Sequence, residues 1–366
     1  MSRPPSPGRG NAVTSRDDRL LSILQKVAPG TALREGVDRI MRAGKGAIIV
    51  LGATDAVESI VSGGFKMNTN FTAQRLSEVA KMDGAIILDT DVERILYANV
   101  HLVPDATITT SETGIRHRTA ERTARHTGLP VVCVSEAMRI VNLYVHDRKH
   151  TLEDISSILF RANQALATLE RYRSRLDEVS AALSALEVEN VVTLRDVLNV
   201  LQRAEMVRRI SDEIERAVAE LGTDGRLLQL QLDELLAGVE GERALVVRDY
   251  LPDRRRNFAA VLEELDVIPA EALLDLWRLT EALGYGPDSG LDQPVAPRGY
   301  RLLSRIPRLP DRTVDALVTQ FTSLPRLMEA TLNDLDAVEG IGAARARLVK
   351  EGLTRLAESS ILEQYA

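Results

Sequence analysis

Glycine and proline are both absent from one long stretch of the chain, Val131 to Leu221. Because these two residues are the usual interrupters of helices and strands, the stretch can hold unusually long regular elements. From Leu152 to Leu186 its apolar residues recur at steps of three and four, which is the spacing of one face of a helix. The sequence therefore predicts one long helix with a continuous apolar seam, which packs on itself or on other subunits.

Short apolar runs rich in β-branched residues precede this helix and predict strands. They are bounded by Gly, Asp or Pro and cover residues 46–52, 84–89, 95–103, 129–136 and 141–146. Runs of this length and composition are typical of strands in a mainly buried sheet. Between them, residues 69–82 carry a helical stripe, with Thr69, Asn70 or Thr72 available as its cap. The pattern predicts an α/β domain.

Shifts in composition divide the chain into four parts. Residues 1–16 are rich in Pro, Gly and Arg and predict a disordered tail, residues 17–148 form the α/β domain, and residues 149–290 form a helical spine. A cluster of Gly, Pro, Asp and Ser marks a linker before a small helical unit over residues 291–366. We therefore expect a multidomain protein of the α/β plus α class.

The overall charge and cysteine content exclude several kinds of protein. A formal net charge of −7 argues against a basic surface over the whole molecule, so a contact with DNA needs a local patch. Cys133 is the single cysteine, which excludes an internal disulfide and a Cys-based zinc site. The N-terminus lacks an apolar signal region, and no later run is long and apolar enough to span a bilayer. We expect a cytoplasmic protein without membrane contact.

The C-terminal unit contains two related segments, residues 306–310 and 338–342, each flanked by helical patterns. The second lies in "LDAVEGIGAARARLV", which matches the helix-hairpin-helix signature. Glycines at the hairpin let the backbone turn tightly and approach a phosphate, which the N-terminus of the next helix can then hold. The residues predicted to contact DNA are Gly340, Ile341, Gly342, Arg345, Arg347 and Lys350.

Two such units in tandem resemble the helix-hairpin-helix domains of DNA repair and recombination proteins, which bind the DNA backbone without reading sequence. The first copy carries Arg308 and Pro310 in place of the two glycines, so a weaker hold on phosphate is expected there. Residues 298–366 contain ten Arg or Lys and nine Asp or Glu, and DNA affinity must therefore come from local charge. A purely structural pair of helices is the alternative.

Two short motifs in the α/β domain indicate chemistry. Asp83 precedes Gly84 at a turn between a helical pattern and a strand, where an Asp-Gly pair is by itself an ordinary turn. Arg116, His117 and Arg118 follow a glycine at the start of another helical pattern. Free N–H groups, the helix dipole and two guanidinium groups meet there, which favours a polyphosphate.

Asp83-Gly84-Ala85 and Arg116-His117-Arg118, with "YANVHLVPD" between them, resemble the two signature motifs of the diadenylate cyclase domain. The order of α/β domain, helical spine and helix-hairpin-helix tail resembles the DNA integrity scanning family over essentially the whole chain. Ile115 departs from the pattern, because the family often has threonine there. A hydroxyl contact to phosphate would be missing at this position.

The resemblance implies a role for each matching residue. Asp83 would hold Mg²⁺ or Mn²⁺ and help to activate a ribose 3′-hydroxyl, and Gly84 would leave room for the nucleotide. Leu102 would line the adenine pocket. The catalytic set would be Asp83, Arg116, His117 and Arg118, and the ATP-binding set Gly84, Leu102, Ile115, Arg116, His117, Arg118 and Thr119.

The implied reaction condenses two ATP molecules into cyclic di-AMP and releases two pyrophosphates. Each protomer would hold one ATP, so two domains must face each other, as in the octamer of the family. The resemblance also implies nucleoid association and control by branched or damaged DNA bound without sequence preference. A non-catalytic, ATP-sensing DNA-binding scaffold is the alternative, although a sensor would not need the acidic group at Asp83.

Overall fold

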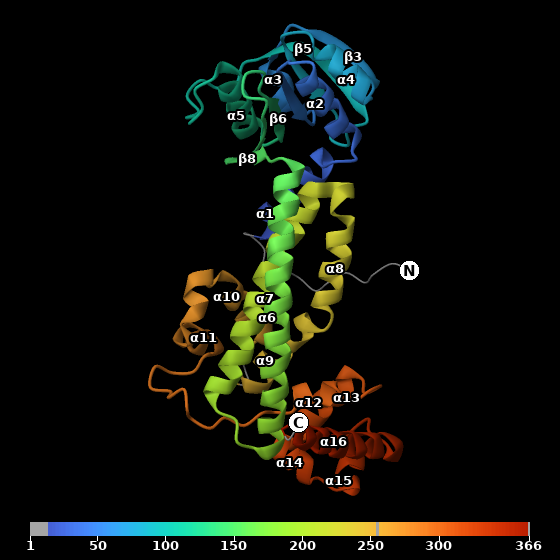
Figure 1. The fold of residues 1–366 in the computed structure, drawn as a ribbon, viewed down its shortest axis with the longest axis vertical. Helices are drawn as coiled ribbons and strands as arrows, with labels where there is room; N and C mark the ends of the chain where they lie inside the picture. The colour runs from blue at the N-terminus through green and yellow to red at the C-terminus, as the bar shows by residue number, and fades with distance from the viewer. Residues whose placement is uncertain (1–13, 254–255, 365–366) are drawn as a thin grey trace. The chain divides into compact units, whose positions relative to one another are not determined.

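The computed structural model describes residues 14–253 and 256–364 (Figure 1). The chain forms two compact units. The sheet unit contains described residues 14–163 and 215–229, and the helical unit contains described residues 164–214, 230–253 and 256–364. The predicted N-terminal tail, residues 1–16, lies largely outside the described residues, and the first helix begins at Thr14.

A mixed sheet forms the centre of the sheet unit, with strand order β2-β5-β4-β1-β6-β7-β8 and with β3 paired to β5. β1 and β4 are parallel, and the other pairs are antiparallel. The strands are β1 (Ala47–Leu51), β2 (Val61–Ser62), β3 (Phe65–Asn70), β4 (Ala85–Leu88), β5 (Arg94–Leu102), β6 (Val131–Val134), β7 (Val141–Val145) and β8 (Arg148–Leu152).

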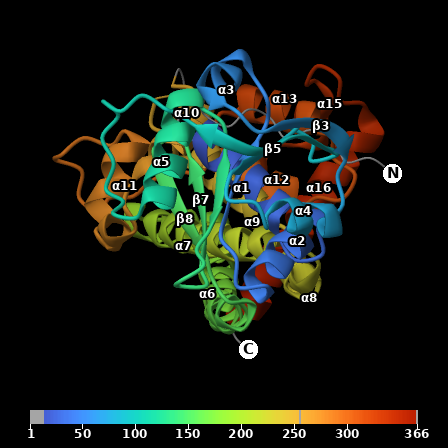
Figure 2. The same cartoon turned by 90° about the horizontal axis from the view of Figure 1, so that it is seen from above.

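Helices cover both faces of this sheet, and Figure 2 shows α5 on one side of β7 and α2 and α4 on the other. One apolar core joins α1, α2 and α4 to the sheet, and a second joins α3 and α5 to the opposite face. The side chain of Thr72 accepts a hydrogen bond from the backbone of Arg75 and caps α4, which confirms one of the three predicted caps. The helices are α1 (Thr14–Val27), α2 (Ala32–Arg42), α3 (Asp55–Ile60), α4 (Ala73–Val79) and α5 (Ile115–Thr127).

The five predicted strands are present, whereas the sequence analysis missed β2, β3 and β8. β3 and β8 are polar and mostly exposed, so they lack the apolar run that reveals a buried strand. β8 corrects two predictions. Leu152 ends this strand instead of starting the long helix, and residues 149–152 belong to the sheet instead of the helical spine.

The predicted long helix is α6 (Ile155–Glu189). Its buried apolar face includes Ala162, Leu166, Leu169, Leu176 and Leu183, which confirms the core of the predicted seam. The helix ends without glycine or proline: Asn190 takes a left-handed conformation, and the Asp196 carboxylate accepts hydrogen bonds from the backbone and hydroxyl of Thr193. A new helix, α7 (Leu194–Leu221), begins there.

The remaining helical elements follow in sequence. They are η1 (Gly222–Gly225), α8 (Arg226–Leu236), α9 (Val239–Tyr250), α10 (Phe258–Val267), η2 (Ala270–Leu274), α11 (Leu276–Leu283), α12 (Tyr300–Ser304), α13 (Asp311–Phe321), α14 (Leu324–Glu329), α15 (Leu332–Asp336) and α16 (Ala343–Gln364). None of the helices in the described residues is both long and apolar enough to cross a membrane.

The last five helices share one apolar core and contain two similar turns. One turn joins α12 to α13 and the other joins α15 to α16. Arg308 in the first has a φ of 65°, and Gly340 at the matching place in the second has a φ of 81°. The Leu309 N–H donates to the Ile306 carbonyl, and the Ile341 N–H donates to the Val338 carbonyl. The repeat seen in the sequence is therefore a repeat of backbone conformation.

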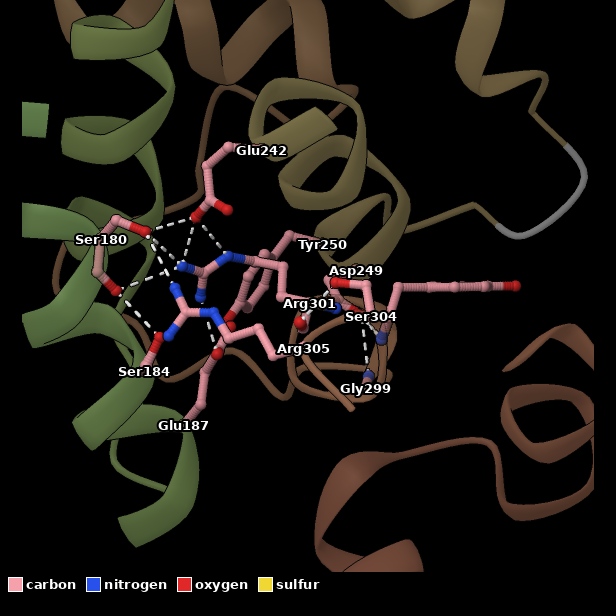
Figure 3. A network of polar contacts seen from close by, with 11 residues as sticks. Ser180, Ser184, Glu187, Glu242, Asp249, Tyr250, Gly299, Arg301, Ser304 and Arg305 are labelled. Carbon is pink, nitrogen blue, oxygen red and sulfur yellow. Dashed lines mark hydrogen bonds and ion pairs between the residues drawn. The ribbon is translucent and has the colours of Figure 1, made fainter. Parts of the chain in front are cut away.

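A buried polar network ties α12 to α6 and α9 (Figure 3). The Arg301 guanidinium pairs with Glu187 of α6 and Glu242 of α9. The Asp249 carboxylate accepts the backbone N–H groups of Gly299, Tyr300 and Arg301 at the start of α12. These contacts fix the beginning of the C-terminal helices within the helical unit.

Candidate active site

Asp83 lies at the turn between α4 and β4 and is exposed. Its carboxylate has no hydrogen-bond or ion-pair partner in the described part of the chain. A hard cation such as Mg²⁺ commonly takes one or two protein carboxylates and completes its shell with water and substrate phosphates. Asp83 therefore fits the predicted metal role, although the described residues contain no cluster of three or more potential metal ligands.

Close packing against β5 leaves no room for a side chain at Gly84. A Cβ atom there would collide with the backbone of Asn99. The Gly84 N–H donates to Asn99 Oδ1 at 3.1 Å, and Asn99 itself has a φ of 56°. This packing fixes the turn that carries Asp83. The predicted contact of Gly84 with a nucleotide stays a prediction.

Arg116 and Arg118 lie in the first turn of α5, and Gly114 is its N-cap residue. No side chain caps this helix end, so its first N–H groups remain available to an anion. The Arg116 guanidinium has no hydrogen-bond or ion-pair partner among the described residues. Arg118 is exposed, and its Nη2 makes one long contact of 3.4 Å to the Thr113 carbonyl.

The sheet register brings the two motifs to one edge. Ile49 of β1 pairs with Ile86 of the parallel strand β4. Extending this register back by three residues sets Gly46 beside Asp83. A Cβ atom on Gly46 would collide with the Arg116 guanidinium, so that guanidinium lies at the edge of the sheet where Asp83 also lies. The Asp83 carboxylate and the Arg116 guanidinium therefore lie at the same edge of the sheet.

His117 differs from the two arginines because its ring is buried beneath α5. Nδ1 lies 3.1 Å from the Tyr144 hydroxyl and 3.2 Å from Asn142 Nδ2, both on β7. The resemblance placed Arg116, His117 and Arg118 together in the ATP-binding set. The structure instead separates two partly or fully exposed guanidinium groups from one imidazole turned toward the sheet.

The other predicted nucleotide residues occupy different environments. Leu102 ends β5 and packs against the core beneath α5. Ile115 is 84% exposed at the start of α5, so the fold does not require an apolar side chain there. Thr119 is half-buried one turn further along the helix. Their contacts with ATP stay predictions.

The predicted DNA residues divide into open and occupied positions. A Cβ atom on Gly340 or Gly342 would meet no atom within 4 Å, so the hairpin backbone is open to approach. Ile341 is buried in the core. Arg347 is exposed, and Arg345 donates to the Gly340 carbonyl at 2.7 Å. Lys350 donates to the carbonyls of Met328 and Ala330, a structural role that the sequence analysis did not anticipate.

Sequence analysis also missed three residues of the site: Gly46, Glu112 and Tyr144. Gly46 was regarded only as the start of a strand, and its neighbour Arg116 is 70 positions away along the printed sequence. Glu112 and Tyr144 have no motif around them, and their relation to His117 arises from pairing between strands. A register for β6, β7 and β8 would have been needed to find them.

Two family models match most of this chain. Residues 34–149 match the nucleotide-binding model described as "DisA bacterial checkpoint controller nucleotide-binding", and residues 152–291 match "DisA bacterial checkpoint controller linker region". The chain is 59% identical over 353 residues to the DNA integrity scanning protein DisA of Acidothermus cellulolyticus, covering 95% of this chain and 96% of that protein.

Two further relatives carry the same name. The protein of Parafrankia sp. is 56% identical, with 95% of this chain and 98% of that protein covered. The protein of Streptomyces griseus is 55% identical, with 99% of this chain and 98% of that protein covered. The chain therefore belongs to the DNA integrity scanning protein family, the DisA bacterial checkpoint controllers.

Proposed function

We propose that the protein is a diadenylate cyclase that condenses two ATP molecules into cyclic di-AMP and two pyrophosphates. The observation that carries this proposal is that Asp83 and the Arg116 guanidinium lie at the same edge of the sheet, at the starts of the neighbouring strands β4 and β1. Family membership supports the same activity, because the relatives are named for DNA integrity scanning and the matching model is a nucleotide-binding domain.

The positive and negative groups of the site have different roles. Arg116, Arg118 and the free N–H groups of α5 bind and orient the triphosphate, because guanidinium groups and a helix N-terminus both favour phosphate oxygens. Asp83 holds a divalent cation, Mg²⁺ or Mn²⁺, which when bound neutralises developing charge on phosphate oxygens. Positioning and charge neutralisation are the main requirements of phosphoryl-type transfer.

Two sheet units must face each other for the two ATP molecules to react. Each ribose 3′-oxygen forms a bond to the α-phosphorus of the other ATP, each bond to the departing β-phosphate oxygen breaks, and each hydroxyl loses its proton. One triphosphate site per chain then requires a facing copy. We propose a homo-oligomer in which the units face each other in pairs, with an octamer as the family assembly.

The C-terminal helices add a DNA-binding function to this proposal. The α15–α16 turn acts as a helix-hairpin-helix contact to the phosphate backbone, with the open glycines Gly340 and Gly342 at its tip. The α12–α13 turn has the same backbone conformation but carries Arg308 at the glycine position. Branched or damaged DNA bound here regulates the cyclase.

Product analysis tests the cyclase. Purified full-length protein is incubated with ATP and Mg²⁺ or Mn²⁺, and the nucleotides are separated by chromatography. We expect cyclic di-AMP with two pyrophosphates for each molecule formed. ATP binding without either product would instead support the non-catalytic scaffold.

A further inference from the structure

A series of polar side chains connects Lys149 at the surface of the sheet unit to the buried His117. Lys149 Nζ lies 2.7 Å from Glu112 Oε1, and the Tyr144 hydroxyl donates to that same oxygen at 2.9 Å. The Tyr144 oxygen then lies 3.1 Å from His117 Nδ1. The four residues come from β8, the loop before α5, β7 and α5 itself.

Strand pairing builds this series. Tyr144 is the register partner of Lys149 across β7 and β8, and Asn142 is the partner of Thr151 two residues away. Alternate residues of a strand share a face, so Asn142 and Tyr144 both point toward α5. Tyr144 and Asn142 are almost fully buried, and a buried polar group without a partner is costly. The four linked side chains are therefore held in one arrangement.

The charges along the series determine the direction of its hydrogen bonds. Burial opposes the charged form of Glu112, but hydrogen bonds from Lys149 and Tyr144 outweigh it and hold its pKa below the usual range. Burial, together with the hydrogen bond to Glu112, raises the pKa of Tyr144. An ionised carboxylate only accepts, so the single phenol proton of Tyr144 points to Glu112.

His117 can consequently act only as a hydrogen-bond donor to Tyr144. Burial lowers the pKa of His117, Glu112 opposes this effect, and the nearby charges of Lys149 and Arg116 add to it. The ring is therefore neutral near pH 7 and carries one proton. Because the Tyr144 hydroxyl donates its hydrogen bond to Glu112, its oxygen can only accept a hydrogen bond from His117. That bond requires a proton on Nδ1.

Two other groups lie near Nδ1, and the assignment is compatible with Cys133 as it stands and with Asn142 once its amide is turned. Burial raises the pKa of Cys133 to about 12, so its thiol, 3.4 Å from Nδ1, is neutral. The Asn142 nitrogen lies 3.2 Å from Nδ1, and its amide oxygen accepts from the Thr151 hydroxyl at 2.7 Å. The two ends of an amide group are exchanged by a half-turn, and a protonated Nδ1 requires the turned form, in which the oxygen accepts from Nδ1 and the nitrogen donates to Thr151.

We propose that Glu112, acting through Tyr144, is a positioning residue that fixes His117 as the Nδ1-protonated tautomer and leaves Nε2 as a hydrogen-bond acceptor. The Cδ2 atom beside Nε2 faces the N-terminus of α5, 3.6 Å from where a Cβ of Gly114 would lie. Nε2 then accepts from a hydroxyl or a water and does not bind a phosphate oxygen. This divides the motif into two phosphate-binding arginines and one acceptor, and its catalytic consequence rests on the proposed cyclase function.

Nitrogen NMR tests the tautomer without requiring activity. Full-length protein labelled with ¹⁵N-histidine is sedimented and studied by solid-state NMR at pH 7.5. The chain has five histidines, and the His117 signals are assigned by their loss in His117→Gln. We expect a protonated Nδ1 and an unprotonated Nε2. A protonated Nε2 in the wild-type protein overturns the proposal.

Tyr144→Phe tests the series, because it keeps the ring and removes the hydroxyl. We expect the Nε2-protonated tautomer to appear and kcat to fall about 10- to 100-fold, as when the orienting partner of a functional histidine is removed. KM for ATP should change less than about threefold, since the arginines are untouched. A wild-type tautomer and wild-type kcat in this variant contradict the proposal.

Two further variants keep the test decisive. Glu112→Gln retains the shape of the side chain but removes its charge, and it should change the tautomer in the same direction even if Tyr144→Phe does not fold. Tyr285→Phe removes a half-buried phenol that donates to the Tyr250 carbonyl at 2.7 Å in the helical unit, and kcat should not change. If wild-type protein makes no cyclic di-AMP, the proposed function fails while the NMR result still decides the tautomer.

Discussion

Arg301 Nη1 and Glu187 Oε2 lie 2.7 Å apart, and both side chains are essentially inaccessible to solvent. Glu187 is near the end of α6 and Arg301 is in α12, so a charged pair joins the long helix to the C-terminal helices. The Tyr250 hydroxyl also donates to Glu187, at 2.7 Å. The ion pairs of Arg301 with Glu187 and Glu242 (Figure 3) make α12 an integral part of the helical unit.

Arg301→Met should destabilise the protein by about 3–5 kcal/mol, because it leaves the buried Glu187 carboxylate without its counter-charge. Chemical denaturation monitored by circular dichroism measures this change. Arg278→Met is the control, because Arg278 and Glu281 form an exposed pair, which is worth about 0–1 kcal/mol. Equal losses in the two variants would contradict a stabilising role for the buried pair. Deletion of residues 298–366 would also remove Arg301 and leave Glu187 unpaired. A lost response to DNA in that variant could therefore result from destabilisation of the helical unit.

Asp83→Asn should keep the fold and slow cyclic di-AMP formation at least about 100-fold. The side chain has no partner to lose, but the amide lacks the charge that holds a hard cation, and the lost stabilisation amounts to several kcal/mol. Turnover with Mg²⁺ and with Mn²⁺ is measured beside thermal unfolding. Asp91→Asn, in the exposed turn between β4 and β5, is the control and should retain full activity. Normal turnover by Asp83→Asn would refute the metal role.

Gly46→Ala should raise KM for ATP about fivefold by displacing the Arg116 guanidinium, equivalent to losing about 1 kcal/mol of a charge-assisted hydrogen bond. Steady-state kinetics of Gly46→Ala, Arg116→Ala and the double variant form a cycle. The two changes act on one contact, so their effects should not add. Fully additive effects would mean that Gly46 does not position Arg116.

Gly340→Ala should weaken binding of a four-way DNA junction at least about tenfold, since a hydrogen bond to a charged group contributes about 1.5–3 kcal/mol. The added Cβ lies where a phosphate would approach. Gly238→Ala is a matched control, because Gly238 also has a positive φ, 84°, with no atom near a Cβ, and therefore has the same backbone strain.

Junction affinity and cyclase rate are measured for both glycine variants at one fixed salt concentration. Gly340→Ala should retain basal cyclase activity and lose the response to the junction, whereas Gly238→Ala should retain both. An unchanged response in Gly340→Ala would show that the α15–α16 turn is not the DNA sensor.

Several features could be predicted from sequence because they depend on local chemistry. The buried strands β1, β4 and β6 are continuous apolar runs, β7 is apolar except for Asn142, and α6 follows from its periodic seam. The turn at Gly340 requires a residue that tolerates positive φ. The positions of Asp83 and of Arg116 before a strand and at the start of a helix were also correct, because the residues next to them carry the turn and helix signals.

Other features depended on which segments pair across the fold. β3 and β8 are polar edge strands, and Arg308 adopts the left-handed conformation of its glycine counterpart without a local signal. The burial of Arg301 follows from acids contributed by α6 and α9, and a lone arginine in a sequence ordinarily indicates an exposed side chain.

The sequence alone determined the buried strands, the long helix α6, their order and the residue types of the two motifs, because propensity and periodicity act over a few neighbouring residues. Only the tertiary structure decided that Gly46 leaves room for Arg116 at the edge of the sheet where Asp83 also lies, and that His117 turns inward to Tyr144. Those relations come from strand register and from burial of polar groups between distant segments, where the cost of an unpaired group selects one arrangement.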